Sequence, residues 1–133
     1  MKYLLDTHTL LWSLLDTKRL SKKVREILEN RDNEIYVSTI ALWEIALKSS
    51  IGKLELENLN IERLPSYIEK TGYKIIDLDK IEAVSYIKLS LNDSHKDPFD
   101  RIMIWQAISR NMIFITKDTK MEEYENDGLK HLW

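Results

Sequence analysis

The sequence lacks cysteine and has few residues that interrupt regular structure, with three glycines and two prolines among 133 residues. Without cysteine, neither a disulfide framework nor a thiolate metal site is possible. No apolar run approaches the roughly 20 residues that a membrane-spanning helix needs. Asp6 interrupts the apolar N-terminal segment and no small-residue cleavage site follows, so we interpret this segment as folded rather than as a signal peptide. We therefore expect a cytoplasmic protein.

The sequence also lacks a large excess of charge of either sign. Its 20 basic and 22 acidic residues give a formal net charge of −2 at pH 7. This balance argues against a protein that coats nucleic acid through bulk charge, so local patches must make any such contact. One basic patch comprises Lys18, Arg19, Lys22, Lys23 and Arg25, and scattered basic residues in the C-terminal third are Lys96, Arg101, Arg110, Lys117 and Lys120.

Short apolar strands alternate with helical patterns along the chain. The expected strands are residues 2–6, 35–37, 73–76 and 112–116, with an edge strand in the last five residues. Helices are expected over 7–15, 22–31, 39–50, around 65–71, over 81–91, from 98 onward and over 119–126. The alternation predicts one α/β/α domain over residues 1–133, with helices on both faces of a mostly parallel sheet of four to five strands.

One acidic residue lies on the apolar side of a predicted helix. Asp97 and Pro98 are typical of a helix start, because aspartate caps free backbone N–H groups and proline fits the first helical position. Asp100 then shares a face with Met103 and Ile104. A carboxylate on a buried face needs a partner, although Asp100 could also belong to a capping box with Asp97.

Glu44 interrupts an apolar helix in the same way. Ile40 lies four residues before it, and Leu47 and Ile51 lie three and seven residues after it. A simple ion pair with Lys48, four residues further on, is the alternative to a functional role.

Two more acids follow strands directly. Ligands of open parallel sheets bind beyond the carboxyl ends of the strands, where Asp6 and Asp118 are expected. Each could instead cap the helix after it, and we assign that capping role to Asp77 and Asp79. Carboxylate oxygens are hard ligands suited to Mg²⁺ or Mn²⁺, and such ions can activate water to attack a phosphodiester.

Four segments of the chain form a set with a particular order and spacing. They are DTHTLLW at 6–12, STIALWEIALK at 38–48, HKDPFDRIMIWQA at 95–107 and FITKD at 114–118. Together they resemble the PIN-domain ribonucleases, especially the VapC-type toxins of prokaryotic toxin–antitoxin pairs. The resemblance implies RNA cleavage that depends on Mg²⁺, or on Mn²⁺, by a homodimer that a small antitoxin holds inactive. The acidic quartet of the family maps onto Asp6, Glu44, Asp100 and Asp118 as metal-binding catalytic residues. Thr7 or Ser38 could add a hydroxyl near the metal, and Thr116 stands where the family often has threonine.

We hypothesise that one or two Mg²⁺ ions bind the quartet and that Arg101 and Lys96 steer the RNA backbone. The alternative is a catalytically silent PIN-like module that binds RNA or a partner protein. We interpret the histidines as caps, core or surface groups, because their spacing is not typical of metal ligands. The tryptophans are interpreted as core or interface anchors rather than base-stacking platforms. The tryptophans are Trp12, Trp43, Trp105 and Trp133, and the histidines are His8, His95 and His131.

Overall fold

The computed structural model of the protein describes residues 1–91 and 94–133 and contains a five-stranded sheet in the order β3-β2-β1-β4-β5. All four neighbouring pairs are parallel. The central strand β1 is flanked by β2 and β4, while β3 and β5 form the edges. The strands are β1 (Lys2–Leu5), β2 (Glu34–Ser38), β3 (Lys74–Ile76), β4 (Ile113–Ile115) and β5 (Lys130–Leu132). The predicted α/β/α fold with a parallel sheet is confirmed.

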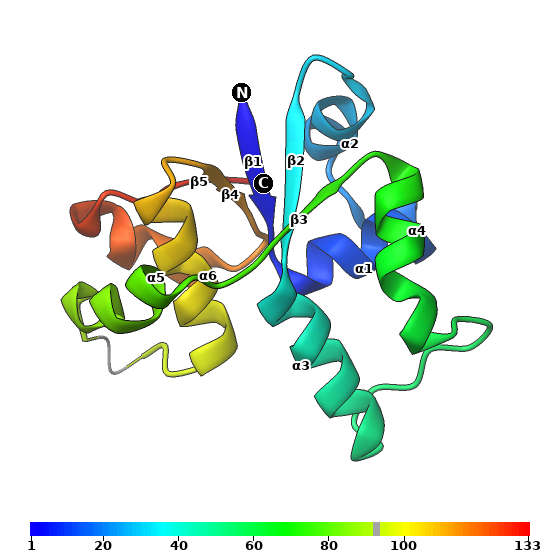
Figure 1. Ribbon diagram of the computed structural model, residues 1–133. Helices are drawn as coiled ribbons and strands as arrows, with labels where there is room; N and C mark the ends of the chain where they lie inside the picture. Colours follow the sequence, from blue (N-terminus) through cyan, green and yellow to red (C-terminus); the bar gives the residue numbers. More distant parts are fainter. Residues whose placement is uncertain (92–93) are drawn as a thin grey trace.

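Helices cover both faces of this sheet (Figure 1), with α1, α2 and α4 on one side and α5 and α6 on the other. Helix α3 continues from the end of β2 and contacts both α1 and α6. The α-helices are α1 (Thr7–Leu15), α2 (Lys22–Glu29), α3 (Thr39–Ser50), α4 (Leu64–Thr71), α5 (Lys80–Ser85) and α6 (Pro98–Ser109). The 3-10 helices are η1 (Thr17–Arg19), η2 (Ile61–Arg63), η3 (Tyr86–Lys88) and η4 (Thr119–Asp127).

The core lies on both sides of β1 and β4. Successive residues of a strand point to opposite faces, and both Leu4 and Leu5 are fully buried. Phe114 and Ile115 on β4 are buried in the same way. Burial on both faces explains why these strands are continuously apolar rather than alternating.

Most of the predicted helix starts are confirmed. The side chains of Asp6, Ser21, Ser38 and Asp97 each accept a backbone N–H at the first turn of a helix. Asp79 forms a full capping box with Glu82, whereas Asp77 does not cap α5. These caps place Asp6 and Ser38 at the carboxyl ends of β1 and β2, where the crevice of a parallel sheet opens.

The prediction of a helix over residues 81–91 is wrong for the second half of this range. Helix α5 ends at Ser85, and a single 3-10 turn leads to Leu89, which is buried in an extended conformation. The apolar residues that suggested a longer helix are exposed: Ile81, Val84, Ile87 and Leu91. The segment 119–127 is also a 3-10 helix. Within the described ranges, no helix has the length and apolar character needed to cross a membrane.

Candidate active site

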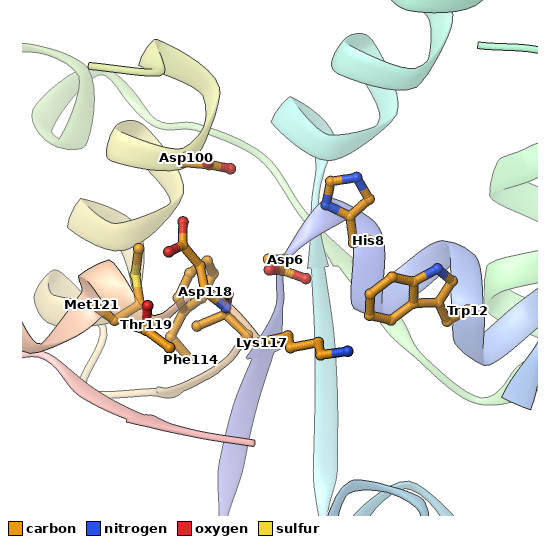
Figure 2. A pocket seen from close by; sticks show the side chains of 10 residues that line it. Asp6, His8, Trp12, Asp100, Phe114, Lys117, Asp118, Thr119 and Met121 are labelled. Atoms are coloured by element: carbon orange, nitrogen blue, oxygen red, sulfur yellow. Dashed lines mark hydrogen bonds between the residues drawn. The ribbon is translucent and has the colours of Figure 1, made fainter. Parts of the chain in front are cut away.

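A hollow of about 440 Å³ opens at the carboxyl ends of β1 and β4. Three of the four acids selected from the sequence line it: Asp6, Asp100 and Asp118. Figure 2 shows Asp100 and Asp118 on the same side of the hollow, with Asp6 rising from the end of β1. The hollow is also lined by His8, Trp12, Phe114, Thr116, Lys117, Thr119 and Met121.

Asp6 lies between β1 and α1 and is hydrogen-bonded to the first turn of the helix. One carboxylate oxygen accepts the backbone N–H of Thr9 at 2.8 Å, which caps α1. Asp6 is 8% exposed, and this burial raises its pKa, while hydrogen bonds from Thr116 and Thr9 oppose the shift. The capping role and the position in the hollow are therefore compatible.

Asp118 combines the same two roles. Its backbone N–H donates to the hydroxyl of Thr116 at 3.1 Å, and its Oδ1 accepts the backbone N–H of Lys120 at 2.9 Å. Its side chain stays 36% exposed, so it can meet a ligand in the hollow.

Asp100 projects from the first turn of α6 and is half-buried. Its pKa is raised to about 6, mainly because burial disfavours the charged carboxylate. The negative charges of Asp97, Glu44 and Asp6 raise the pKa further, while a hydrogen bond from His95 lowers it. Carboxylates that repel one another in this way gain most from a bound cation.

His95 is a site residue that the sequence interpretation missed. The ring is 4% exposed, and its Nε2 lies 3.3 Å from Oδ2 of Asp100 and 4.0 Å from Oδ2 of Asp118. One ligand atom from each of these residues lies within 4.8 Å of the others. The spacing of five residues to Asp100 was the signal available in the sequence, but neither residue alone reveals the third partner.

Arg101 has a different role from the predicted one. It is 6% exposed and donates hydrogen bonds to the hydroxyls of Tyr86 and Tyr124, each at 2.8 Å. Tyr124 in turn lies 2.8 Å from Nδ1 of His95. Arg101 therefore supports the wall behind His95, and the prediction that it steers RNA is wrong because its guanidinium is enclosed.

Glu44 is buried as expected, although Leu47 and Ile51 on its predicted apolar stripe are exposed. Thr7 donates to its Oε1, and the ammonium of Lys48 binds its Oε2. The Lys48 pair considered from the sequence is thus present. Glu44 does not line the hollow, but its charge is close enough to raise the pKa of Asp100.

The three hydroxyl groups selected from the sequence have separate partners. Thr7 contacts Glu44, and Thr116 supports Asp6 and Asp118. Ser38 caps α3 and donates to Gln106 at 2.6 Å, so it is engaged away from the hollow. Lys96 is exposed and is not among the residues that line the hollow.

The carboxylates in the hollow suit a divalent cation. Asp6, Asp100 and Asp118 line it, His95 lies beside the last two, and hard carboxylate oxygens are the ligands that Mg²⁺ and Mn²⁺ prefer. The ammonium of Lys48 is paired with Glu44, and the guanidinium of Arg101 donates to two tyrosines, so their direct hydrogen bonds go to groups other than Asp100 and Asp118. A bound cation would offset the negative charges of Asp97, Glu44 and Asp6, which add to the effect of burial in raising the pKa of Asp100.

The chain is similar to known proteins in both sequence and structure. It is similar to Ribonuclease VapC22 of Mycobacterium tuberculosis, with 23% identity over 133 residues that cover 98% of this chain and 97% of that protein. It is also similar to the solved structure of VapBC2 from Rickettsia felis bound to a promoter DNA fragment. That match has a TM-score of 0.69 and 20% identity and covers 99% of this chain and 98% of that one.

A second similar structure is VapBC-1 from nontypeable Haemophilus influenzae, with a TM-score of 0.68 and 21% identity over 99% of this chain and 97% of that one. These structural similarities support the fold. Residues 3–127, nearly the whole chain, match the profile of the PIN domain. The chain therefore belongs to the PIN domain family.

Proposed function

We propose that this protein is an endoribonuclease that depends on Mg²⁺ or Mn²⁺ and is the toxin of a type II toxin–antitoxin pair. The observation that carries the proposal is the convergence of Asp6, Asp100 and Asp118 from three distant segments on one hollow. Similarity to a protein named a ribonuclease, and to complexes named VapBC, supports the reaction and the kind of partner. We propose that residues 1–133 act as one nuclease domain.

Asp6, Asp100 and Asp118 bind the cation in this proposal, and Glu44 joins them directly or through a water molecule. A bound divalent cation supplies positive charge that stabilises the phosphodiester and favours ionisation of the attacking water. Hydrolysis adds that water to phosphorus and breaks one P–O bond of the RNA backbone. Thr116 holds Asp6 and Asp118 in place, and His95 orients Asp100.

The exposed apolar residues of α5 and η3 fit the expected homodimer. Val84 and Ile87 are 72% and 87% exposed, and Ile81 and Leu91 extend the same stretch of chain. A contiguous patch of exposed apolar side chains is typical of a surface that contacts another protein. We propose that a second copy of the chain covers them.

A catalytically silent PIN-like module that binds RNA or protein is the second candidate. The observation that favours catalysis is that Asp6, Asp100 and Asp118 line one common hollow. Cleavage of structured RNA by purified protein with Mg²⁺, with EDTA, and with Asp6→Asn separates the two candidates. We expect cleavage only by the unaltered protein with Mg²⁺, whereas equal products in all three reactions would reject the metal mechanism.

A further inference from the structure

The hollow has a second end whose chemistry differs from that of the acids. Besides Asp6, Asp100 and Asp118, its lining includes His8, Trp12 and Lys117. His8 follows Asp6 by two residues and Lys117 precedes Asp118, so the same two chain segments supply both ends. Figure 2 shows Asp118 directed toward Asp100 and Lys117 directed toward Trp12. We call His8, Trp12 and Lys117 the aromatic end.

Two rings of the aromatic end are already stacked. The centroids of His8 and Trp12 lie 5.7 Å apart with an interplanar angle of 28°. Trp133 supports Trp12 through an edge contact at 5.8 Å and 67°. His8 is exposed and Trp12 is half-buried, so the stack is anchored in the protein and open at its outer side.

Two cations accompany these rings. The guanidinium carbon of Arg19 and the ammonium nitrogen of Lys117 each lie 5.8 Å from the Trp12 ring centroid. Arg19 also pairs with Asp16, whereas Lys117 forms no ion pair with any described residue. The exposed Lys117 side chain is long enough to exchange its ring contact for an anionic group nearby.

We infer that the aromatic end binds the nucleotide next to the phosphate that is cut, with its base stacked on the His8–Trp12 pair and its phosphate beside Lys117. This inference rests on the proposed function, because it places the reacting phosphate among the acids. Aromatic rings and cations together suit a planar base linked to a phosphate. A base stacks there only when it is unpaired, so the substrate class is single-stranded RNA or a loop.

Stacking on this pair implies little preference among bases, because each base presents an aromatic face. The aromatic end thus contributes affinity and selects unpaired RNA over duplex. Sequence recognition would have to come from other contacts.

The test measures binding separately from cleavage. All variants are made in an Asp118→Asn background, and anisotropy reports binding of a labelled single-stranded oligoribonucleotide and of its duplex. We expect His8→Ala and Trp12→Leu each to weaken single-strand binding about tenfold, as loss of one stacked base predicts. Trp12→Phe keeps an aromatic face and should therefore lose less affinity than Trp12→Leu. Trp43→Leu is the matched control, because Trp43 is 59% exposed and does not line the hollow.

Lys117→Gln should reduce the salt dependence of binding by about one phosphate contact, whereas the neighbouring Lys120→Gln should not. Because Trp12 packs on Trp133, thermal melts check that Trp12→Leu folds. If it does not fold, the variants of the exposed residues His8 and Lys117 test whether the aromatic end binds RNA. Equal affinity of the His8, Lys117 and control variants, or equal binding of duplex and single strand, would overturn the inference. Cleavage by the wild-type protein is measured in parallel. If the protein binds RNA in the expected pattern but never cuts it, the proposed nuclease activity is refuted and the proposed binding role of the aromatic end is not.

Discussion

The hydroxyl of Thr7 donates a 2.5 Å hydrogen bond to the carboxylate of Glu44, 37 residues away in the chain. Thr7 directly follows Asp6, so this bond connects the first turn of α1 to the middle of α3 beside the acidic hollow. Lys48 binds the other oxygen of Glu44. Glu44 thus has structural partners, and its proposed role at the metal must be separated from them.

We expect Glu44→Gln to reduce Mn²⁺ affinity and RNA cleavage more than tenfold, because it removes a negative charge near Asp100 while Gln can still accept from Thr7. Lys48→Met should leave cleavage close to wild type. It should lower the free energy of unfolding without metal by about 1 kcal/mol, since a buried carboxylate loses its cation. Calorimetric titration, cleavage rates and urea unfolding measure these effects. Equal losses of metal affinity in the two variants would mean that Glu44 serves the ion pair with Lys48 and has no separate role in metal binding.

His95 provides a second separable role. The Asp100 carboxylate only accepts hydrogen bonds, so Nε2 of His95 carries the hydrogen that points toward it, and Nδ1 faces Tyr124. We expect His95→Ala to weaken Mn²⁺ binding about tenfold, the lower range for losing a partner of a metal ligand. His95→Gln should restore much of the affinity because its amide can donate at the Nε2 position, whereas the shorter His95→Asn should not. Gln performing as poorly as Ala would show that His95 binds the metal itself.

The raised pKa of Asp100 predicts a pH dependence of the metal-free protein. The folded state binds a proton on Asp100 more tightly than the unfolded state, because the pKa of Asp100 is about 6 in the folded protein rather than the ordinary aspartate value of 3.8. The stabilising contribution is therefore complete below the lower value and is lost as the pH rises through 6. Urea unfolding in EDTA should show that Asp100→Asn flattens the stability profile between pH 4 and pH 7 relative to wild type. Profiles of identical shape would refute the assignment of this shift to Asp100.

The proposed homodimer predicts the effect of charge on its surface. Val84→Glu and Ile87→Glu should convert a dimer into a folded monomer, because a carboxylate buried between apolar surfaces lacks a partner. Light scattering after size exclusion measures the mass, and circular dichroism checks the fold. Leu15→Glu, a change at another exposed apolar residue, is the control and should remain dimeric. A dimer that survives both substitutions would place the interface elsewhere.

Much of the fold and three positions in the hollow could be predicted from the sequence. Asp6 and Asp118 follow strands directly, and the rule that ligands bind beyond parallel strand ends depends only on that order. The start of α6 was visible in Asp97 and Pro98, which set the backbone locally. Local caps and periodicity carry this information because they act within a few residues.

What could not be predicted depends on contacts between distant segments. Arg101 looked like a surface cation, yet Tyr86 and Tyr124 enclose it from segments 15 and 23 residues away. His95 gained significance only when α6 and the loop after β4 brought Asp100 and Asp118 beside it. The apolar pattern predicts a helix up to residue 91. Leu89 is instead buried in an extended conformation after the 3-10 turn, so packing in the fold overrides the local helical pattern.

Binding of Mn²⁺ in solution, followed by electron paramagnetic resonance, decides whether the carboxylates of the hollow hold a divalent cation. We expect the wild-type protein to bind Mn²⁺ and Mg²⁺ to compete for the site. Each of Asp6→Asn, Asp100→Asn and Asp118→Asn should weaken binding at least tenfold while the fold persists. The matched variant Asp77→Asn, outside the hollow, should bind like wild type. Wild-type protein that binds Mn²⁺ no better than the three hollow variants would contradict the claim that these carboxylates share a divalent cation.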